Sequence, residues 1–160
     1  AYLQASNPCA MTVNRVLDDA DAAIEVHPDQ KLVRLIWKRP MAGEAYRAVL
    51  ERLLELVRSE GLRLWLSDGR KAGPILYDDQ VWTMSTFTPR VMEAGLERIA
   101  IVSSEDVLNK LAVDRMVNAT PASAPYDIGF FEDPAIAQLW LMDPRHGQRT
   151  QDAVPQNGVR

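Results

Sequence analysis

The sequence predicts one α/β domain with a mixed, mostly parallel five-stranded sheet, an antiparallel edge hairpin and about four flanking helices. Three observations predict it. Two short runs flank a tight turn, the first with alternating residues and the second rich in β-branched and large apolar residues. After them, short apolar runs alternate with stretches of helical spacing, and Pro or Gly residues separate successive segments. Alternation of strands and helices favours right-handed crossovers, which make neighbouring strands parallel.

The expected hairpin consists of residues 22–27 and 31–38. Pro28 and Asp29 lie between the two runs and supply turn chemistry, because proline fixes φ and aspartate bonds to its own backbone. The two strands are therefore expected to be antiparallel neighbours.

The clearest helix covers residues 44–59, whose apolar side chains recur at three- and four-residue spacing. Gly61 is placed to end it in a left-handed conformation. A short strand over 62–67 follows, and the loop Asp68–Pro74 comes next.

A second helix is expected over residues 77–94. Pro89 lies inside it and must kink or divide it, because proline has no N–H for the helical ladder. The apolar run 99–102 is typical of a strand covered on both faces.

Two further helices complete the pattern, with a strand over 126–131 between them. Ser103 or Ser104 is expected to cap the first of these helices, and Asp133 to cap the second. Their expected buried faces consist of apolar residues at helical spacing: Val107, Leu108, Leu111 and Ala112 in the first, Ile136, Leu139 and Trp140 in the second.

The expected domain covers residues 22–142. Residues 1–21 are weakly periodic and are interpreted as a partly ordered N-terminal arm. Residues 143–160 are polar, with a late Pro and Gly, and are interpreted as a disordered tail.

Composition argues against several classes of protein. The 160-residue chain has a net charge of −4, so nucleic acid is not an expected partner, because binding phosphate requires a concentrated basic face. No apolar run approaches the roughly 20 residues of a transmembrane segment. Cys9 is the only cysteine, which excludes an intrachain disulfide and fits a reducing compartment. The first ten residues lack the pattern of a signal peptide, so a cytoplasmic location is expected.

The sequence does not predict a catalytic centre, a metal site or a cofactor. The two histidines, His27 and His146, do not lie beside a nucleophile motif, and both are expected to be exposed. A minimal hydrolase that uses Asp68 and His27 is the weakest of the alternatives considered.

The loop after the third expected strand is the first candidate site. Arg70, Lys71 and loop N–H groups could hold an anion at the carboxyl end of a strand, although the sequence lacks the ending of a P-loop. The alternative is structural, with Arg70 pairing with Asp68 or with a nearby aspartate.

The divided helix is the second candidate site. Trp82 and Phe87 lie close to Pro89, where a helix seldom seals completely against a sheet and a groove could open. Ordinary core packing is the alternative explanation for these aromatic residues.

Several short motifs occur together in this chain: Leu66-Ser67-Asp68-Gly69-Arg70-Lys71, Asp79-Gln80-Val81-Trp82, Pro89-Arg90, Ala94-Gly95-Leu96, Arg98-Ile99-Ala100-Ile101-Val102 and Phe130-Phe131-Glu132-Asp133 with Ala135 and Trp140. As a set they resemble the SpoIIAA-like, STAS-like family of small bacterial proteins, fold relatives of anti-sigma-factor antagonists and CRAL-TRIO domains. The resemblance covers roughly residues 22–141. It implies a mixed sheet flanked by helices and a binding or regulatory role, since most members have no assigned reaction.

One departure from the family bears on regulation. Phosphorylated anti-sigma antagonists carry a serine or threonine at the start of the helix that follows the third strand. This chain has Tyr77-Asp78-Asp79 there, which argues against a kinase-controlled partner switch.

The first functional hypothesis is a non-enzymatic STAS-like binding or regulatory module that engages a protein partner or a second copy of itself. Its surface would be the 68–74 loop with the 77–94 helix. The alternative is a carrier of a small apolar or amphipathic ligand, held in a groove between that helix and the sheet. The candidate binding residues are Asp68, Arg70, Lys71, Trp82 and Phe87.

Overall fold

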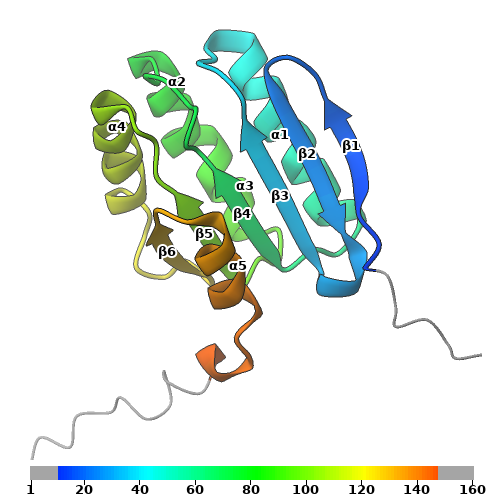
Figure 1. Cartoon of the computed structure of the whole chain (residues 1–160). Coiled ribbons are helices and arrows are strands. Elements are labelled where there is room, and N and C mark those ends of the chain that lie inside the picture. The colour runs from blue at the N-terminus through cyan, green and yellow to red at the C-terminus, as the bar shows by residue number, and fades with distance from the viewer. Residues whose placement is uncertain (1–10, 148–160) are drawn as a thin grey trace, which may run out of the picture.

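The computed structural model describes residues 11–147, which form one six-stranded sheet with helices on both faces (Figure 1). The strand order is β1-β2-β3-β4-β5-β6. The pairs β1–β2 and β2–β3 are antiparallel, and the three remaining pairs are parallel. The expected α/β class and edge hairpin are confirmed. The strands are β1 Asn14–Asp18, β2 Ala22–His27, β3 Leu32–Trp37, β4 Leu64–Asp68, β5 Arg98–Val102 and β6 Asp127–Phe131.

The sheet has one strand more than the five expected, because β1 lies inside the segment interpreted as an arm. Four of its five residues are exposed, so it carries no apolar alternation that could reveal a strand. A bulge interrupts its pairing with β2 between Arg15 and Leu17. Residues 1–10 and 148–160, which include most of the expected tail, lie outside the described residues. Residues 144–147 form a short 3-10 turn.

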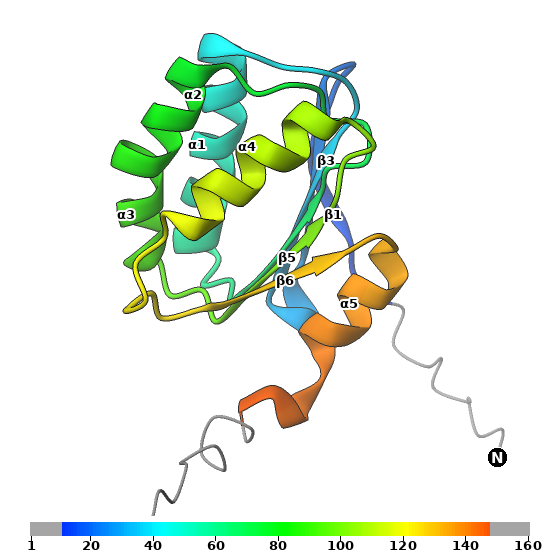
Figure 2. The same ribbon diagram turned by 90° about the vertical axis from the view of Figure 1, so that its left-hand side faces the viewer.

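The helices are distributed unequally between the two faces of the sheet. Figure 2 shows α1, α2, α3 and α4 on one side and α5 alone on the other. No helix within residues 11–147 is both long and apolar enough to cross a membrane. The helices are α1 Gly43–Ser59, α2 Tyr77–Trp82, α3 Thr88–Met92, α4 Val107–Asn118 and α5 Pro134–Met142.

Each face of the sheet has its own core, because successive side chains of a strand point to opposite faces. The larger core includes Val33, Leu35 and Ile99 and packs against α1 and α3. The smaller core joins β3, β4 and β5 to α5 through seven buried residues: Leu32, Leu64, Leu66, Ala100, Val102, Ala137 and Leu141.

The helix around Pro89 is divided by its hydrogen-bond pattern into three segments, and its backbone remains helical at both junctions. A π-helical segment, η2 (Thr83–Phe87), lies between α2 and α3, and Pro89 occupies the start of α3. Proline has no N–H to continue the helical ladder, and the π-helical segment lies immediately before it.

Two helices pack on the sheet through a face that differs in part from the one expected. In α4, Ala112 is buried as expected, but Val107, Leu108 and Leu111 are exposed, and Asn109 is buried instead. The helix begins later than expected, because Asp106 caps it by accepting the N–H of Asn109 at 2.7 Å. The N-cap of α4 is therefore Asp106, and not Ser103 or Ser104 as expected.

The expectation for α5 is also partly wrong, although its expected cap, Asp133, is confirmed. Trp140 packs against the smaller core as expected. Ile136 and Leu139 are exposed, and Ala137 and Leu141 are buried instead. Both helices carry apolar residues on two faces, so spacing alone cannot decide which face packs inward.

Candidate ligand-binding pocket

A pocket of about 370 Å³ lies between the helical layer and the face of the sheet that α1, α3 and α4 cover. Its floor is the sheet, and its roof consists of helices. Floor residues come from four strands and the loops after them: Trp37, Trp65, Ser67, Ile99, Ile101, Ser103, Ile128, Phe130 and Glu132. Roof residues include Tyr46 and Leu50 of α1, Thr83, Phe87, Thr88 and Val91 around α3, and Asn109, Lys110, Val113, Asp114, Met116 and Val117 of α4.

The pocket exists because α4 buries little of itself against the sheet. Only Asn109 and Ala112 are buried among its twelve residues. Its other inward residues, such as Val113 and Met116, line open space. A helix that packed directly on the sheet would bury a continuous apolar stripe.

Hydrogen bonds hold the first turn of α4, and the segment just before it, to the loop after β4. The side-chain amide Nδ2 of Asn109 donates to the carbonyl of Gly73 at 2.8 Å. The hydroxyl of Ser104 donates to the carbonyl of Ala72 at 2.6 Å. Gly73 also packs against Pro40, since a Cβ at Gly73 would lie 2.5 Å from Cγ of that ring. The loop and the start of α4 therefore form one unit.

Aromatic side chains form the wall below α1 and α3. Trp37 stacks on Tyr46 with ring centroids 5.5 Å apart, and Trp65 meets Phe87 edge-on at 6.3 Å. Trp82 stacks behind Phe87 at 5.6 Å and does not line the pocket. These contacts fix the rings, so the wall is largely preformed.

The pocket is polar at one end and mostly apolar at the other. Ser67, Ser103 and Glu132 lie at the carboxyl ends of their strands, beside the first turns of α4. The opposite end is formed by residues at the starts of β5 and β6 and the ends of α3 and α4: Val91, Ile99, Met116, Val117, Thr120, Tyr126 and Ile128. Thr120 and Tyr126 are the polar exceptions at that end.

The pKa values of two tyrosines indicate that the pocket wall is of low polarity. Burial raises the pKa of Tyr46 to about 12, although the hydrogen bond between its hydroxyl and Thr83 opposes the shift. Burial also raises the pKa of Tyr126. A negative charge is therefore disfavoured beside these rings.

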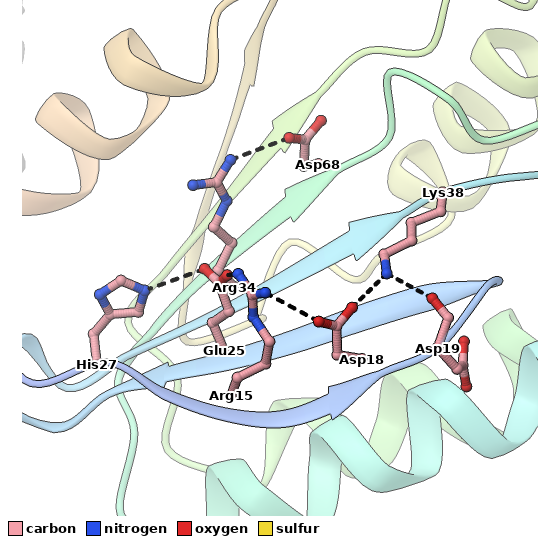
Figure 3. A network of polar contacts seen from close by, with 8 residues as sticks. All are labelled: Arg15, Asp18, Asp19, Glu25, His27, Arg34, Lys38 and Asp68. Carbon is pink, nitrogen blue, oxygen red and sulfur yellow. Dashed lines mark hydrogen bonds and ion pairs between the residues drawn. The ribbon is translucent and has the colours of Figure 1, made fainter.

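Four of the five expected site residues, including Trp82, do not line the pocket. Asp68 is buried on the opposite, α5-covered face, where Arg34 donates to it at 3.3 Å (Figure 3). Arg70 makes two hydrogen bonds to the same carboxylate, both 2.9 Å long. Arg70 is thus engaged with Asp68, which is the structural alternative stated for this loop. Lys71 is exposed on the loop, and Phe87 alone of the five lines the pocket.

The carboxyl group of Asp68 remains ionised despite its burial. Burial by itself would raise the pKa, but hydrogen bonds and charge from Arg70, with a further bond from Arg34, outweigh it. The pKa of Asp68 is therefore lower than that of an ordinary aspartate.

His27 belongs to a polar network on the same face as Asp68 and is not exposed as expected. Its side chain is 12% exposed, and Nε2 lies 3.7 Å from a carboxylate oxygen of Glu25. Arg15 donates to the other oxygen of Glu25 at 2.7 Å (Figure 3). The network is built by cross-strand neighbours on β1 and β2. The side chain of His146 lies outside the described part of the chain.

Asp68 and His27 do not meet, so the structure does not assemble the hydrolase pair considered above. His27 aligns with Leu32 of β3, and Leu32 aligns with Leu64 of β4. Asp68 lies four residues beyond Leu64, about 13 Å along the strand at the usual rise per residue. Within residues 11–147, no group of three or more His, Cys, Asp or Glu side chains is arranged to hold a metal ion.

Sequence reasoning missed the α4 side of the pocket. The signal was present, because Asn109, Val113, Met116, Val117 and Thr120 recur at helical spacing and define the inward face. The more apolar set at Val107, Leu108 and Leu111 concealed it.

Comparison with known proteins adds one solved structure. No family model and no curated protein matches the sequence. The structure is an uncharacterised protein of the DUF3478 family with a SpoIIAA-like fold from Shewanella loihica PV-4. It is 17% identical, covers 86% of this chain and 98% of its own, and has a TM-score of 0.47. The fold named for it is the one the sequence motifs resemble. The fold of the present chain is established by its own strand order.

Proposed function

We propose that this protein is a non-catalytic binding module that carries a small apolar or amphipathic molecule in the pocket below α3 and α4. The observation that carries this proposal is the 370 Å³ space left where α4 stands away from the sheet. It corresponds to the alternative stated from the sequence, a groove between the divided helix and the sheet, and extends it to α4.

The size of the pocket supports a ligand-binding role. Protein interiors contain few voids larger than a water molecule. The pocket is much larger than a water molecule, and its volume of about 370 Å³ lies in the range of small-molecule sites.

Blocking the pocket tests the proposal. Val113→Trp places an indole in the space between α4 and the sheet, and we expect it to weaken binding of naphthol, a neutral fluorescent probe, about tenfold or more. The measurement is the change in naphthol emission on titration with protein. Native mass spectrometry of freshly purified wild type should also show a co-purifying small molecule that the variant lacks.

The matched control is Leu108→Trp, on the outer face of the same helix, where the side chain is 60% exposed. This variant should bind naphthol like wild type. Equal binding by wild type and Val113→Trp, with no co-purifying species in either, would refute the proposed function.

A second candidate function, engagement of a protein partner, is favoured by a separate observation. The α2–α4 surface, defined by exposed apolar residues of these helices and the residue preceding α2, is held together by a hydrogen bond from Arg115 to Gln80 at 2.9 Å. Exposed apolar patches mark interaction sites. The surface includes part of the helix expected to bind a partner. Its residues are Leu76, Tyr77, Val81, Val107, Leu108 and Leu111.

Sedimentation velocity over a range of concentrations tests this candidate with a second copy of the chain as the partner. We expect wild type to self-associate and the double variant Leu108→Ser, Leu111→Ser to remain monomeric, because the variant removes apolar surface that association would bury. A wild type that stays monomeric at every concentration excludes the second copy as that partner.

A further inference from the structure

We infer that the molecule carried in the pocket has a neutral hydrogen-bonding head group, such as a hydroxyl or amide, at the end of an apolar chain or ring. This inference rests on the proposed function and specifies the ligand's chemistry. Its basis is the placement of polar and charged residues around the pocket, together with the volume available.

The volume sets the size of the ligand part that the pocket can cover. A water-sized group occupies about 30 Å³ in a liquid, so 370 Å³ accommodates roughly a dozen non-hydrogen atoms. A single chain or a pair of fused rings fits this volume, whereas a membrane lipid with two long chains would extend beyond the pocket.

The polar end offers neutral donors and acceptors. Asn109 is only 4% exposed, and its Nδ2 is engaged with Gly73, which leaves the side-chain carbonyl as an acceptor. The hydroxyl oxygen of Ser67 accepts from Nε1 of Trp37 at 3.3 Å and retains its own proton for donation. Ser103 adds a further hydroxyl. A head group that both donates and accepts can use this set, whereas a carboxylate only accepts.

The charged residues of the rim do not favour an anion. Arg39 is paired with Asp21. Lys110 and Asp114 lie one turn apart on the same helix, so their charges offset each other. Glu132 remains as excess negative charge at the polar end. Arg70, the cation of the neighbouring loop, is held by Asp68 on the other face of the sheet.

The interior of the pocket adds a desolvation cost for any charged head. Tyr46, in the pocket wall, has a pKa raised to about 12 by burial, and the same environment penalises a carboxylate or phosphate. The negative charge at the rim repels an anionic head group, and the apolar wall removes water from it. Both effects disfavour binding of an anion relative to binding of a neutral head group.

Four probes of matched chain length test the inference: decanol, decanoate, decylammonium and decane. Binding to the wild-type chain is measured at neutral pH by the change in tryptophan fluorescence, because two of the four tryptophans, Trp37 and Trp65, line the pocket. We expect decanol to bind about tenfold or more tightly than decanoate, because the carboxylate must be desolvated. Decanol should also bind more tightly than decane, which lacks a head group.

The outcomes separate this inference from the proposed function. Equal or tighter binding of decanoate or decylammonium overturns the neutral head and leaves the pocket as a binding site. Equal binding of decane and decanol also overturns it, because the head would then be unrecognised. Binding of none of the four, together with no effect of Val113→Trp on naphthol, removes the proposed function itself.

Variants at the polar end provide a second test. Ser103→Ala should weaken the binding of decanol and leave the binding of decane unchanged. The substitution leaves the hydrogen bond between Asn109 and Gly73 in place. Glu132→Gln should narrow the difference between decanol and decanoate about twofold to fivefold, since an exposed charge contributes up to about 1 kcal/mol. If both variants bind decanol, decane and decanoate with the same relative affinities as the wild type, the assignment of the polar end is contradicted.

Discussion

Asp68→Asn is expected to lower the free energy of unfolding by about 3 kcal/mol at neutral pH, as when one partner of a buried ion pair is removed. The carboxylate is 3% exposed and is held by Arg34 and Arg70, so the amide leaves two guanidinium groups without their counter-ion. Urea denaturation followed by circular dichroism measures the change. Asp127→Asn, an exposed aspartate at the start of β6, is the control and should change stability by no more than about 0.5 kcal/mol.

The same substitution should change the response to acid. The pKa of Asp68 is lower in the folded chain than in the unfolded chain, so ionisation stabilises the fold above the unfolded pKa of about 3.9. This contribution is lost as the pH falls through the lower, folded value. Wild type should therefore lose more stability than Asp68→Asn below about pH 4. Parallel pH profiles for the two proteins would show that the arginines do not hold the carboxylate.

Leu141→Ala is expected to destabilise the protein by about 2–5 kcal/mol, because it opens a cavity where α5 packs on the sheet. Leu141 is fully buried and contributes to the smaller core with Leu66. Leu139→Ala, two residues earlier in the same helix, should cost about 0.5 kcal/mol or less, because Leu139 is 68% exposed. Thermal denaturation compares the pair. A larger effect at Leu139 would show that α5 packs through the face expected from sequence.

The elements with the strongest patterns were predicted nearly residue for residue. Helix α1 was expected over 44–59 and spans Gly43–Ser59, because one apolar stripe faces one polar face. Gly61, expected to end it, has a φ of +60°. The hairpin strands were equally clear, since an alternating run and an apolar run flank a proline turn. Strand β1 was missed because an exposed edge strand needs no buried face, and so carries no apolar period.

The site was harder to predict because adjacent residues of a strand serve different faces. Ser67 lines the pocket, whereas Asp68, the next residue, points to the α5 side and binds Arg34 and Arg70. Residues that are adjacent in a sequence motif therefore lie on opposite faces of the sheet. Phe87 was assigned to the groove, and it does line the pocket, because a divided helix leaves space beside it. The contribution of α4 depended on a helix face that spacing alone could not select.

The bulge in β1 has a consequence for aggregation. An edge strand with free backbone groups is a template for strands of other molecules, and regular pairing is what allows a sheet to grow into a fibre. On β1 the bulge between Arg15 and Leu17 breaks that regularity, and the charges of Arg15 and Asp18 resist an apolar neighbour. The strand that sequence patterning could not recognise is therefore also a poor seed for intermolecular sheets.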